Sequence, residues 1–274
     1  MGKEYALPIG LFDSGMGGLT VFSALSAALP NEDLLYLGDT ARLPYGTKSQ
    51  DTIIRYTLKA AQELVDRGVK MLVLACNTAT ANALPHLQAR FAPLPVLGVV
   101  EPGAMAAVAL SKNNRILVLA TEATIKSGVY VKAIHALNPK AQTLQKACTL
   151  FVPMAEEGLM EGHLVEEVAR YYLADILAGT ERPDTMILGC THFPLLKKSL
   201  ERVVGPAIAV VDPAATVAAC VSKELARHCL LNQHPHTPIY HWMTTDNRER
   251  FARTGSLFVG HPLAVDAIEL IDLT

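Results

Sequence analysis

The sequence predicts an α/β fold, with two similar parallel-sheet α/β domains that face each other across a central cleft. Three observations favour this fold class. Short apolar runs alternate with longer segments of helical periodicity along most of the chain, which is typical of parallel sheets covered by helices. Two of these runs end in a cysteine followed by small polar residues, at Cys76 and Cys190. Each is followed further along by a Val-Val-acid-Pro pattern, at 99–102 and at 210–213.

Composition excludes several classes of protein. The chain has 274 residues, of which 50% are hydrophobic, and a formal net charge of −2. This length suits one large domain or two smaller ones with a substantial core. A net charge near zero without a basic cluster predicts neither a nucleic-acid partner nor a membrane surface. The apolar stretch 207–221 contains Asp212 and Pro213, so it does not predict a membrane span.

The cysteines predict free thiols. They stand at positions 76, 148, 190, 220 and 229, with neither a metal-type CxxC pair nor the short spacing of a disulfide scaffold. No signal-peptide pattern precedes the first apolar run, so we expect a cytoplasmic protein with reduced thiols. Cys148, Cys220 and Cys229 lie in strand-like or helical patterns and are expected to be small buried hydrophobic residues.

Eight apolar runs predict strands. They cover Pro8–Phe12, Leu34–Leu37, Met71–Leu74, Val96–Val100, Arg115–Leu119, Leu150–Val152, Thr185–Leu188 and Ile208–Val211.

Helical periodicity between these runs is clearest in segment 49–67, whose apolar residues recur on one face and which Gly68 ends. Further helices are predicted at about 125–137, opened by Thr124, and at 162–178, closed by Gly179.

The order of the motifs suggests an internal repeat. Cys76 and Cys190 lie 114 residues apart (190 − 76), and the two Val-Val-acid-Pro patterns begin 111 residues apart (210 − 99). Matching order and near-equal spacing favour two similar α/β units. Coincidence between ordinary valine-rich strands is the alternative.

Both cysteine motifs stand where parallel sheets bind ligands, beyond the carboxyl end of a strand. A thiol at a helix N-terminus is expected to have a lowered pKa. The neighbouring Asn77, Thr78 and Thr191 are neutral donors suited to carboxylate groups. The alternative is that both cysteines are merely small buried residues.

Two more loops of the first unit carry candidate site residues. "FDSGMGGLT" places Asp13 and Ser14 before a glycine-rich turn that is neither GxGxxG nor a P-loop. Asp13 is read as a carboxylate close to Cys76 or, alternatively, as a helix cap. "LGDTARLPYGTK" supplies a turn with spare backbone amides at Pro44, Tyr45 and Gly46.

The second unit offers a histidine and a glutamate pair. His192 follows Cys190 by two residues, where it can favour the thiolate or shuttle a proton. Glu156 and Glu157 would ordinarily form the solvated first turn of a helix. The histidines at 232–242 stand among prolines without ligand spacing, so a loop is expected there and no metal site.

Two equivalent thiols suit inversion of a carbon stereocentre. One thiol removes a proton from one face of the carbon while the other delivers a proton to the opposite face. With each sulfur about 3–3.5 Å from the carbon, the thiols would stand roughly 6–7 Å apart. A disulfide switch would need them much closer, and acyl transfer needs only one nucleophile.

Six motifs together resemble the glutamate racemases of the aspartate/glutamate racemase family: "FDSGMGGL", "GDTARLPYG", "ACNTAT", "VEP", "LFVPMAEEG" and "LGCTHFPL". The resemblance covers about residues 8–213, and "GCTH" looks like the glutamate enzyme, whereas aspartate relatives typically carry "GCTE". It implies an isomerase that supplies D-glutamate for peptidoglycan and cell-wall synthesis, without a metal or other cofactor.

The resemblance also implies residue roles. Cys76 and Cys190 correspond to the two acid/base residues, and Asp13, Glu156 and His192 to residues that assist proton transfer. Substrate contacts correspond to Asp13, Ser14, Pro44, Tyr45, Gly46, Asn77, Thr78, Thr191 and His192.

In the family the chain returns at its end to the first domain. The implied first domain is 1–99 plus 212–274, with Cys76, and the second is 100–211, with Cys190.

The expected partner is a small molecule, L- or D-glutamate, and the sequence leaves a homodimer open. Two alternatives remain at this point. One is a related racemase or isomerase acting on aspartate, a hydantoin or another small diacid. The other is a non-catalytic amino-acid-binding regulatory protein on the same scaffold.

Overall fold

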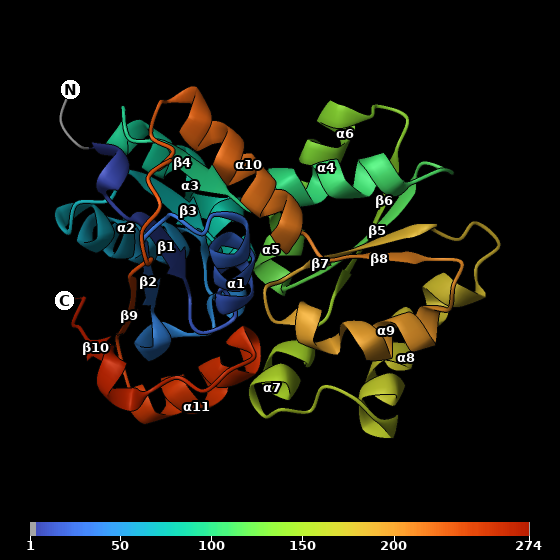
Figure 1. Ribbon diagram of the computed structural model, residues 1–274. Helices are drawn as coiled ribbons and strands as arrows, with labels where there is room; N and C mark the ends of the chain where they lie inside the picture. The colour runs from blue at the N-terminus through green and yellow to red at the C-terminus, as the bar shows by residue number, and fades with distance from the viewer. Residues whose placement is uncertain (1–3, 274) are drawn as a thin grey trace.

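A computed structural model describes residues 4–273 and contains two parallel sheets covered by helices (Figure 1). The predicted fold class is therefore confirmed. The strands are β1 (Ile9–Asp13), β2 (Leu34–Gly38), β3 (Met71–Leu74), β4 (Val96–Gly98), β5 (Arg115–Ala120), β6 (Gln142–Ala147), β7 (Thr185–Gly189), β8 (Ala209–Val211), β9 (Tyr240–Thr244) and β10 (Ile268–Leu270).

The helices cover both faces of the sheets. They are α1 (Leu19–Ala28), α2 (Gln50–Asp66), α3 (Asn77–Phe91), α4 (Val100–Leu110), α5 (Glu122–Ser127), α6 (Val129–Leu137), α7 (Phe151–Glu156), α8 (His163–Ala178), α9 (Lys197–Val204), α10 (Ala214–Arg227) and α11 (Arg248–Val259). Short 3-10 helices are η1 (Glu4–Ala6), η2 (Thr40–Arg42), η3 (Tyr45–Thr47), η4 (Phe193–Leu196) and η5 (Val265–Ala267).

The two sheets repeat one strand order. The six-stranded sheet runs β10-β9-β2-β1-β3-β4 and the four-stranded sheet runs β6-β5-β7-β8, with every pair parallel. In both, the first strand of the unit lies between the second and the third. The order therefore reverses beside β1 in one sheet and beside β5 in the other, which is where open parallel sheets bind ligands. Cys76 follows β3 and Cys190 follows β7, so the two thiols occupy equivalent places.

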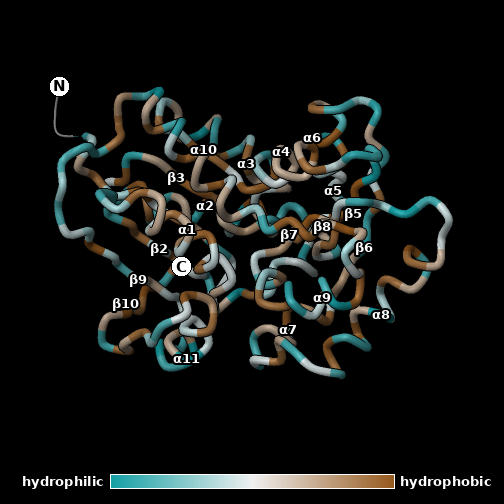
Figure 2. The backbone as a smooth tube through the Cα atoms, turned by 45° about the vertical axis from the view of Figure 1, so that its right-hand side comes forward, coloured by the Kyte–Doolittle hydropathy of each residue, from teal (hydrophilic) through white to brown (hydrophobic). Residues whose placement is uncertain are grey.

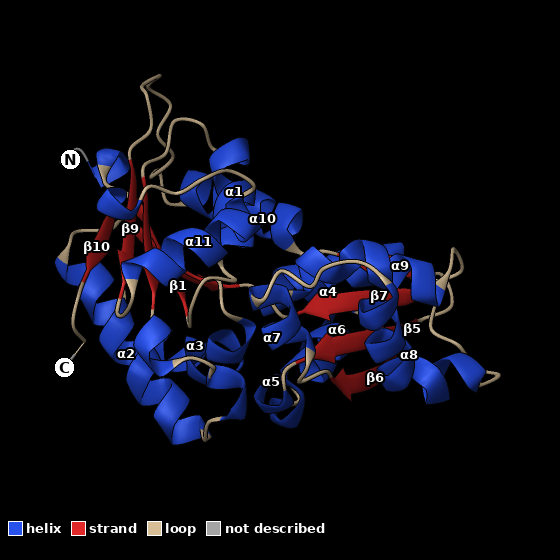
Figure 3. Ribbon diagram, turned by 90° about the horizontal axis from the view of Figure 1, so that it is seen from below, coloured by secondary structure: helices blue, strands red, loops and turns tan. Residues whose placement is uncertain are grey.

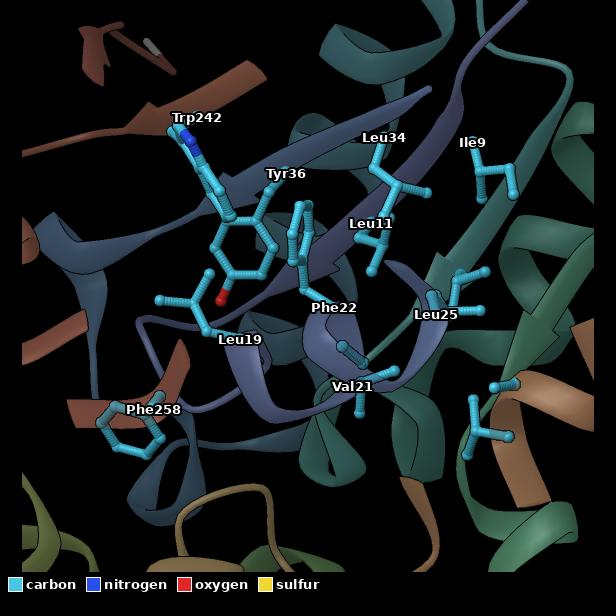
Figure 4. Packing of buried hydrophobic residues seen from close by; sticks show 14 of the residues in the cluster. Ile9, Leu11, Leu19, Val21, Phe22, Leu25, Leu34, Tyr36, Trp242 and Phe258 are labelled. Atoms are coloured by element: carbon cyan, nitrogen blue, oxygen red, sulfur yellow. The ribbon is translucent and has the colours of Figure 1, made fainter. Parts of the chain in front are cut away.

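The core of the six-stranded sheet contains side chains from both ends of the chain. Phe22 of α1 packs on Trp242 of β9 with ring centroids 4.2 Å apart, and Tyr36 of β2 lies beside both (Figure 4). The Tyr36 hydroxyl donates to the carbonyl of Gly15, 3.0 Å away. Through this bond the core fixes the loop after β1. Hydrophobic residues also form β5 and β7 of the other sheet (Figure 2).

The chain passes between the sheets next to the two Val-Val-acid-Pro patterns. After β4, helix α4 packs on β7, β8 and α6 of the four-stranded sheet; after β8, helix α10 packs on α1 beside the six-stranded sheet. Helices α4 and α10 also pack on each other (Figure 1). The domain limits at 99/100 and 211/212 stay a prediction, and residues 1–3 and 274 lie outside the described part.

Several sequence expectations about elements were wrong. Leu150–Val152 is not a strand, since Phe151 begins α7, and an apolar run of this length suits either structure. The predicted strand at Val96–Val100 ends at Gly98, because Val100 begins α4. The helix expected at 125–137 is two helices separated by Gly128, which has a φ of 65°.

Strands β6, β9 and β10 were not predicted. β6 is a half-exposed edge strand with a polar sequence, and β10 is very short. β9 begins at Tyr240, so the loop expected at 232–242 was wrong for its last three residues. Segment 49–67 is confirmed as α2, capped by Ser49, and segment 162–178 as α8.

Candidate active site

A small cavity of about 30 Å³ lies between the carboxyl ends of the two sheets. The strand ends and the loops that follow them supply its walls. The lining residues are Ser14, Gly15, Leu43, Pro44, Tyr45, Gly46, Cys76, Asn77, Thr78, Thr121, Val152, Glu156, Cys190, Thr191 and His192. Both motif cysteines therefore line the same cavity, and both are buried, with exposures of 5% and 6%.

Cys76 is the N-cap residue of α3. Its sulfur accepts from the amide N–H of Ala79 at 3.4 Å and donates to the Ser14 hydroxyl at 3.4 Å. Both partners are neutral. They hold the sulfur in place without bringing a positive charge to it.

Burial dominates the ionisation of Cys76. Burial, and then the nearby Asp13 carboxylate, raise the pKa of Cys76 to about 12, although Ser14 and Ala79 oppose them. The sequence expectation that the helix N-terminus lowers the pKa of this thiol was therefore wrong. At neutral pH Cys76 is a thiol and can serve as a proton donor.

Asp13 lies beneath the cavity wall, fully buried at the end of β1. Its Oδ2 accepts from the amide of Gly15 at 2.9 Å, while Oδ1 has no hydrogen-bond partner within residues 4–273. Burial raises the pKa of Asp13, and the positive charge of His192 opposes that rise. A buried carboxyl oxygen without a partner is a candidate proton acceptor.

Cys190 belongs to a chain of polar contacts that Cys76 lacks. Its sulfur lies 3.9 Å from Nδ1 of His192, and Nε2 of His192 lies 3.0 Å from Oε1 of Glu156. The other oxygen of Glu156, Oε2, accepts from Arg250 at 3.0 Å.

The ionisation of His192 and that of Glu156 depend on each other. Burial lowers the pKa of His192, but its contacts with Cys190 and Glu156 outweigh burial and raise it to about 10. Burial would raise the pKa of Glu156, but His192 and Arg250 hold it below its ordinary value. His192 is thus an imidazolium at neutral pH, suited to stabilise negative charge on the neighbouring sulfur.

The polar residues beside the cysteines contact the opposite unit. The Tyr130 hydroxyl donates to Oδ1 of Asn77 at 2.7 Å, so the Asn77 amide keeps its two N–H donors. Thr78 shares a hydrogen bond of 2.8 Å with Thr121, which follows β5. The Thr20 hydroxyl donates to the carbonyl of Thr191 at 3.3 Å. These bonds brace the cavity walls against each other.

The structure brings the predicted site residues together. All except Asp13 line the cavity, and Asp13 lies directly behind Ser14. The Tyr45 hydroxyl donates to Asp39 at 2.6 Å. Tyr45 therefore contributes its ring and its backbone to the cavity, and not its hydroxyl. The sequence predicted Glu156 in the solvated first turn of a helix, and this was wrong. Glu156 ends α7, and its side chain is 10% exposed.

Sequence reasoning missed other residues of the site. Thr121 follows β5, at the position equivalent to the end of β1, so the strand-end rule could have found it. Leu43 and Val152 carry no chemical signal, and Arg250 lies in the C-terminal part, where the motifs give no guidance. Of the three other cysteines expected to be buried, Cys148 is buried and Cys220 is partly exposed. Cys229 is exposed in a left-handed turn with a φ of 58°.

Residues 4–273 contain no group of three or more His, Cys, Asp or Glu side chains that could hold a metal ion. Over the same range no helix has the length and apolar character that a membrane crossing needs. Two thiols that line one cavity, one beside an imidazolium and one beside a buried carboxyl, can remove one proton from a bound molecule and deliver another.

Comparison with known proteins shows the family of this chain. The family model for Asp/Glu/Hydantoin racemase matches residues 15–221. The chain belongs to this racemase family. A glutamate racemase of Geobacter metallireducens is 45% identical over 256 residues, covering 93% of each chain.

Solved structures of this racemase family share the whole fold. Glutamate racemase of Francisella tularensis, in complex with D-glutamate, matches with a TM-score of 0.90 and 37% identity, covering 98% of both chains. Glutamate racemase of Thermus thermophilus, in complex with β-chloro-D-alanine, matches with a TM-score of 0.87 and 38% identity, also over 98% of both chains.

Proposed function

We propose that this protein interconverts L- and D-glutamate by proton transfer at the α-carbon between Cys76 and Cys190. The observation that carries the proposal is the equivalent placement of the two thiols, each after the third strand of its unit and both on one cavity. The similarity to glutamate racemases over nearly the whole chain supports glutamate as the substrate. D-Glutamate formed in this way would supply peptidoglycan synthesis, as the family resemblance implies.

In the proposed mechanism, Cys190 takes the α-proton from L-glutamate, and Cys76 delivers its own proton to the opposite face. The reverse direction exchanges the two roles. His192 stabilises charge on Cys190 and is held by Glu156, while Asp13 lies behind Cys76 as a proton acceptor. Neutral donors from Ser14, Asn77, Thr78 and Thr191 and the backbone at Pro44, Tyr45 and Gly46 would bind the two carboxylates.

We also propose that the protein is cytoplasmic, because its described cysteines are free thiols. The experiment for the function is circular dichroism of L- and D-glutamate with the purified protein, with L-aspartate as the comparison. The circular-dichroism signal should decay with both glutamate enantiomers and decay much more slowly with aspartate. Faster turnover of aspartate, or none of any amino acid, would refute the proposal.

The same assay tests the expected independence from cofactors. Protein treated with a chelator and dialysed should keep its full rate. Loss of activity that a metal ion or pyridoxal phosphate restores would contradict this expectation.

A further inference from the structure

Helix α11 extends the polar contacts of Cys190 across the cavity to the other unit. It follows β9 of the six-stranded sheet and packs on α1, whereas Glu156 ends α7 beside the four-stranded sheet (Figures 1 and 3). From α11, Arg250 reaches Oε2 of Glu156, and the Phe258 ring meets the His192 ring edge-on with centroids 5.2 Å apart. One helix therefore contacts both residues that stand behind the Cys190 thiol.

The place of Arg250 in α11 is unfavourable for the helix itself. It lies in the first turn, where the helix dipole favours acidic residues and disfavours cations. Its backbone amide is already bound, because it donates to the Asn247 cap at 2.8 Å. The side chain thus contributes to something other than helix stability, and its partner in the structure is Glu156.

Stability does not explain the ion pair either. The Arg250 side chain is 45% exposed, and such pairs contribute little to folding. Glu156, by contrast, is 10% exposed and uses its two oxygens for two different partners, His192 and Arg250. A carboxylate held at both oxygens cannot rotate away from the imidazole.

We propose that Arg250 is a positioning residue for proton transfer at Cys190, which acts by holding Glu156 and, through Glu156, the imidazole of His192. This inference rests on the proposed function, in which Cys190 serves the L face of the substrate carbon. Because Arg250 and Glu156 belong to elements of different sheets, the bond exists only while α11 and α7 lie together.

The test must separate the two faces of the substrate. The enantiomers of glutamate have equal free energies, so kcat/KM for racemisation must be equal in both directions for every variant. Irreversible elimination from 3-chloroglutamate avoids this constraint. The thiolate takes the α-proton, the electron pair forms the Cα–Cβ double bond and chloride leaves; the enamine then takes up water and releases ammonium and 2-oxoglutarate.

Three variants suffice. Arg250→Gln removes the charge, Arg250→Lys keeps it, and Arg253→Gln removes an exposed charge one turn along α11. Arg253 has no ion-pair partner in the described part of the chain, so it is the matched control.

Arg250→Gln should lower kcat for elimination from the L-configured analogue by roughly 10-fold, below the 10²-fold that an ångström of misplacement can cost. KM and elimination from the D-configured analogue should change much less. Arg250→Lys should recover part of the rate, and Arg253→Gln should match the unaltered protein. Equal losses from both analogues, a change in KM alone, or equal behaviour of Arg250→Gln and Arg253→Gln would overturn the proposal.

A second readout does not depend on glutamate turnover. The ring signals of His192 in a ¹⁵N NMR spectrum, assigned by their loss in His192→Asn, should shift in Arg250→Gln and stay in place in Arg253→Gln. If the unaltered protein does not act on glutamate, the proposed function fails. The NMR signals still show whether Arg250 influences His192. Unchanged His192 signals in Arg250→Gln would overturn the positioning role in either case.

Discussion

At the residue scale, the two thiols occupy equivalent strand ends but differ in their surroundings. Cys76 has neutral hydrogen-bond partners and a buried carboxyl nearby, and the pKa of its thiol is raised to about 12. Cys190 has an imidazolium beside it, held by Glu156. In the proposed reaction one thiol therefore begins as the proton donor and the other as the acceptor. This asymmetry predicts different behaviour of the two cysteine variants.

Cys76→Ala and Cys190→Ala should each reduce racemisation by at least about 10²–10⁴-fold, the usual contribution of general acid–base catalysis. Each variant keeps one thiol, which still suffices for elimination. Cys190→Ala should release 2-oxoglutarate from the D-configured 3-chloroglutamate, and Cys76→Ala only from the L-configured one. Cys220→Ala is the control, because Cys220 lies in α10 away from the cavity. Racemisation by Cys76→Ala at a substantial rate would refute the two-thiol assignment.

The contacts of His192 with Cys190 and Glu156 predict a pH dependence of folding stability. The folded pKa of His192 is raised to about 10, above the roughly 6.5 of an unfolded histidine. Its contribution to stability is therefore complete below about pH 6.5 and is lost as the pH rises to about 10. In urea denaturation, the free energy of unfolding of the unaltered protein should exceed that of His192→Asn by more at pH 6 than at pH 10. Between pH 6 and pH 10, this difference in the free energy of unfolding should decrease by at least about 1 kcal/mol.

The variant Glu156→Gln provides the control for that measurement. Without the carboxylate, the pH-dependent part of the difference should shrink. A difference between the unaltered protein and His192→Asn that stays constant from pH 6 to pH 10 would contradict the raised pKa.

At the element scale, the loop between β1 and α1 reaches across to the second cysteine motif. A Cβ atom on Gly17 would lie 2.4 Å from Nδ1 of His192 and 2.4 Å from the hydroxyl of Thr191. Glycine is thus needed here for close approach, because the absence of a side chain lets the turn before α1 contact the loop that follows Cys190. The glycine-rich turn after β1, which matches neither GxGxxG nor a P-loop, thus lies at the contact between the two units.

Gly17→Ala should therefore impair the site more than the fold. The added methyl must displace His192 or Thr191, and a shift of this size should reduce racemisation by roughly 10-fold or more. Gly179→Ala is the matched change, because a Cβ there meets ordinary contacts at 3.5 Å and beyond. Unaltered kinetics in Gly17→Ala, with a normal melting temperature, would show that His192 has more freedom than the structure indicates.

The elements also mark the limit of prediction from sequence. Strands ending at Cys76 and Cys190 were predictable, since buried parallel strands are continuous apolar runs with clear ends. β6 was not, because an edge strand with one solvated face carries a polar sequence. Cavity residues at strand ends followed from general rules, whereas Arg250 depends on how α11 packs against α7, a contact between residues 94 positions apart.

The ionisation of Cys76 was predicted in the wrong direction for a similar reason. The helix N-terminus is visible in the sequence, but the depth of burial and the proximity of Asp13 are properties of the folded chain. Local rules gave the positions of the site residues, and tertiary packing set their charges.

At the scale of the whole molecule, the repeated strand order explains how two thiols of one chain line the same cavity. Both sheets direct the end of their third strand toward the same cavity, and bonds such as Thr78 to Thr121 and Tyr130 to Asn77 join the units across it. A nearly symmetric enclosure suits a reaction whose substrate and product are mirror images. The polar contacts from Cys190 through His192 and Glu156 to Arg250 are the principal departure from that symmetry.

The central claim is that one thiol removes the α-proton while the other delivers a different proton to the opposite face. It is tested most directly by D-glutamate in deuterated water, with the α-position of substrate and product followed by NMR during early turnover. The donor thiol exchanges with solvent, so the first L-glutamate formed should carry deuterium, while the remaining D-glutamate carries almost none. Deuterium appearing early in recovered D-glutamate at the level of the product would mean that a single base serves both faces, and would contradict the account.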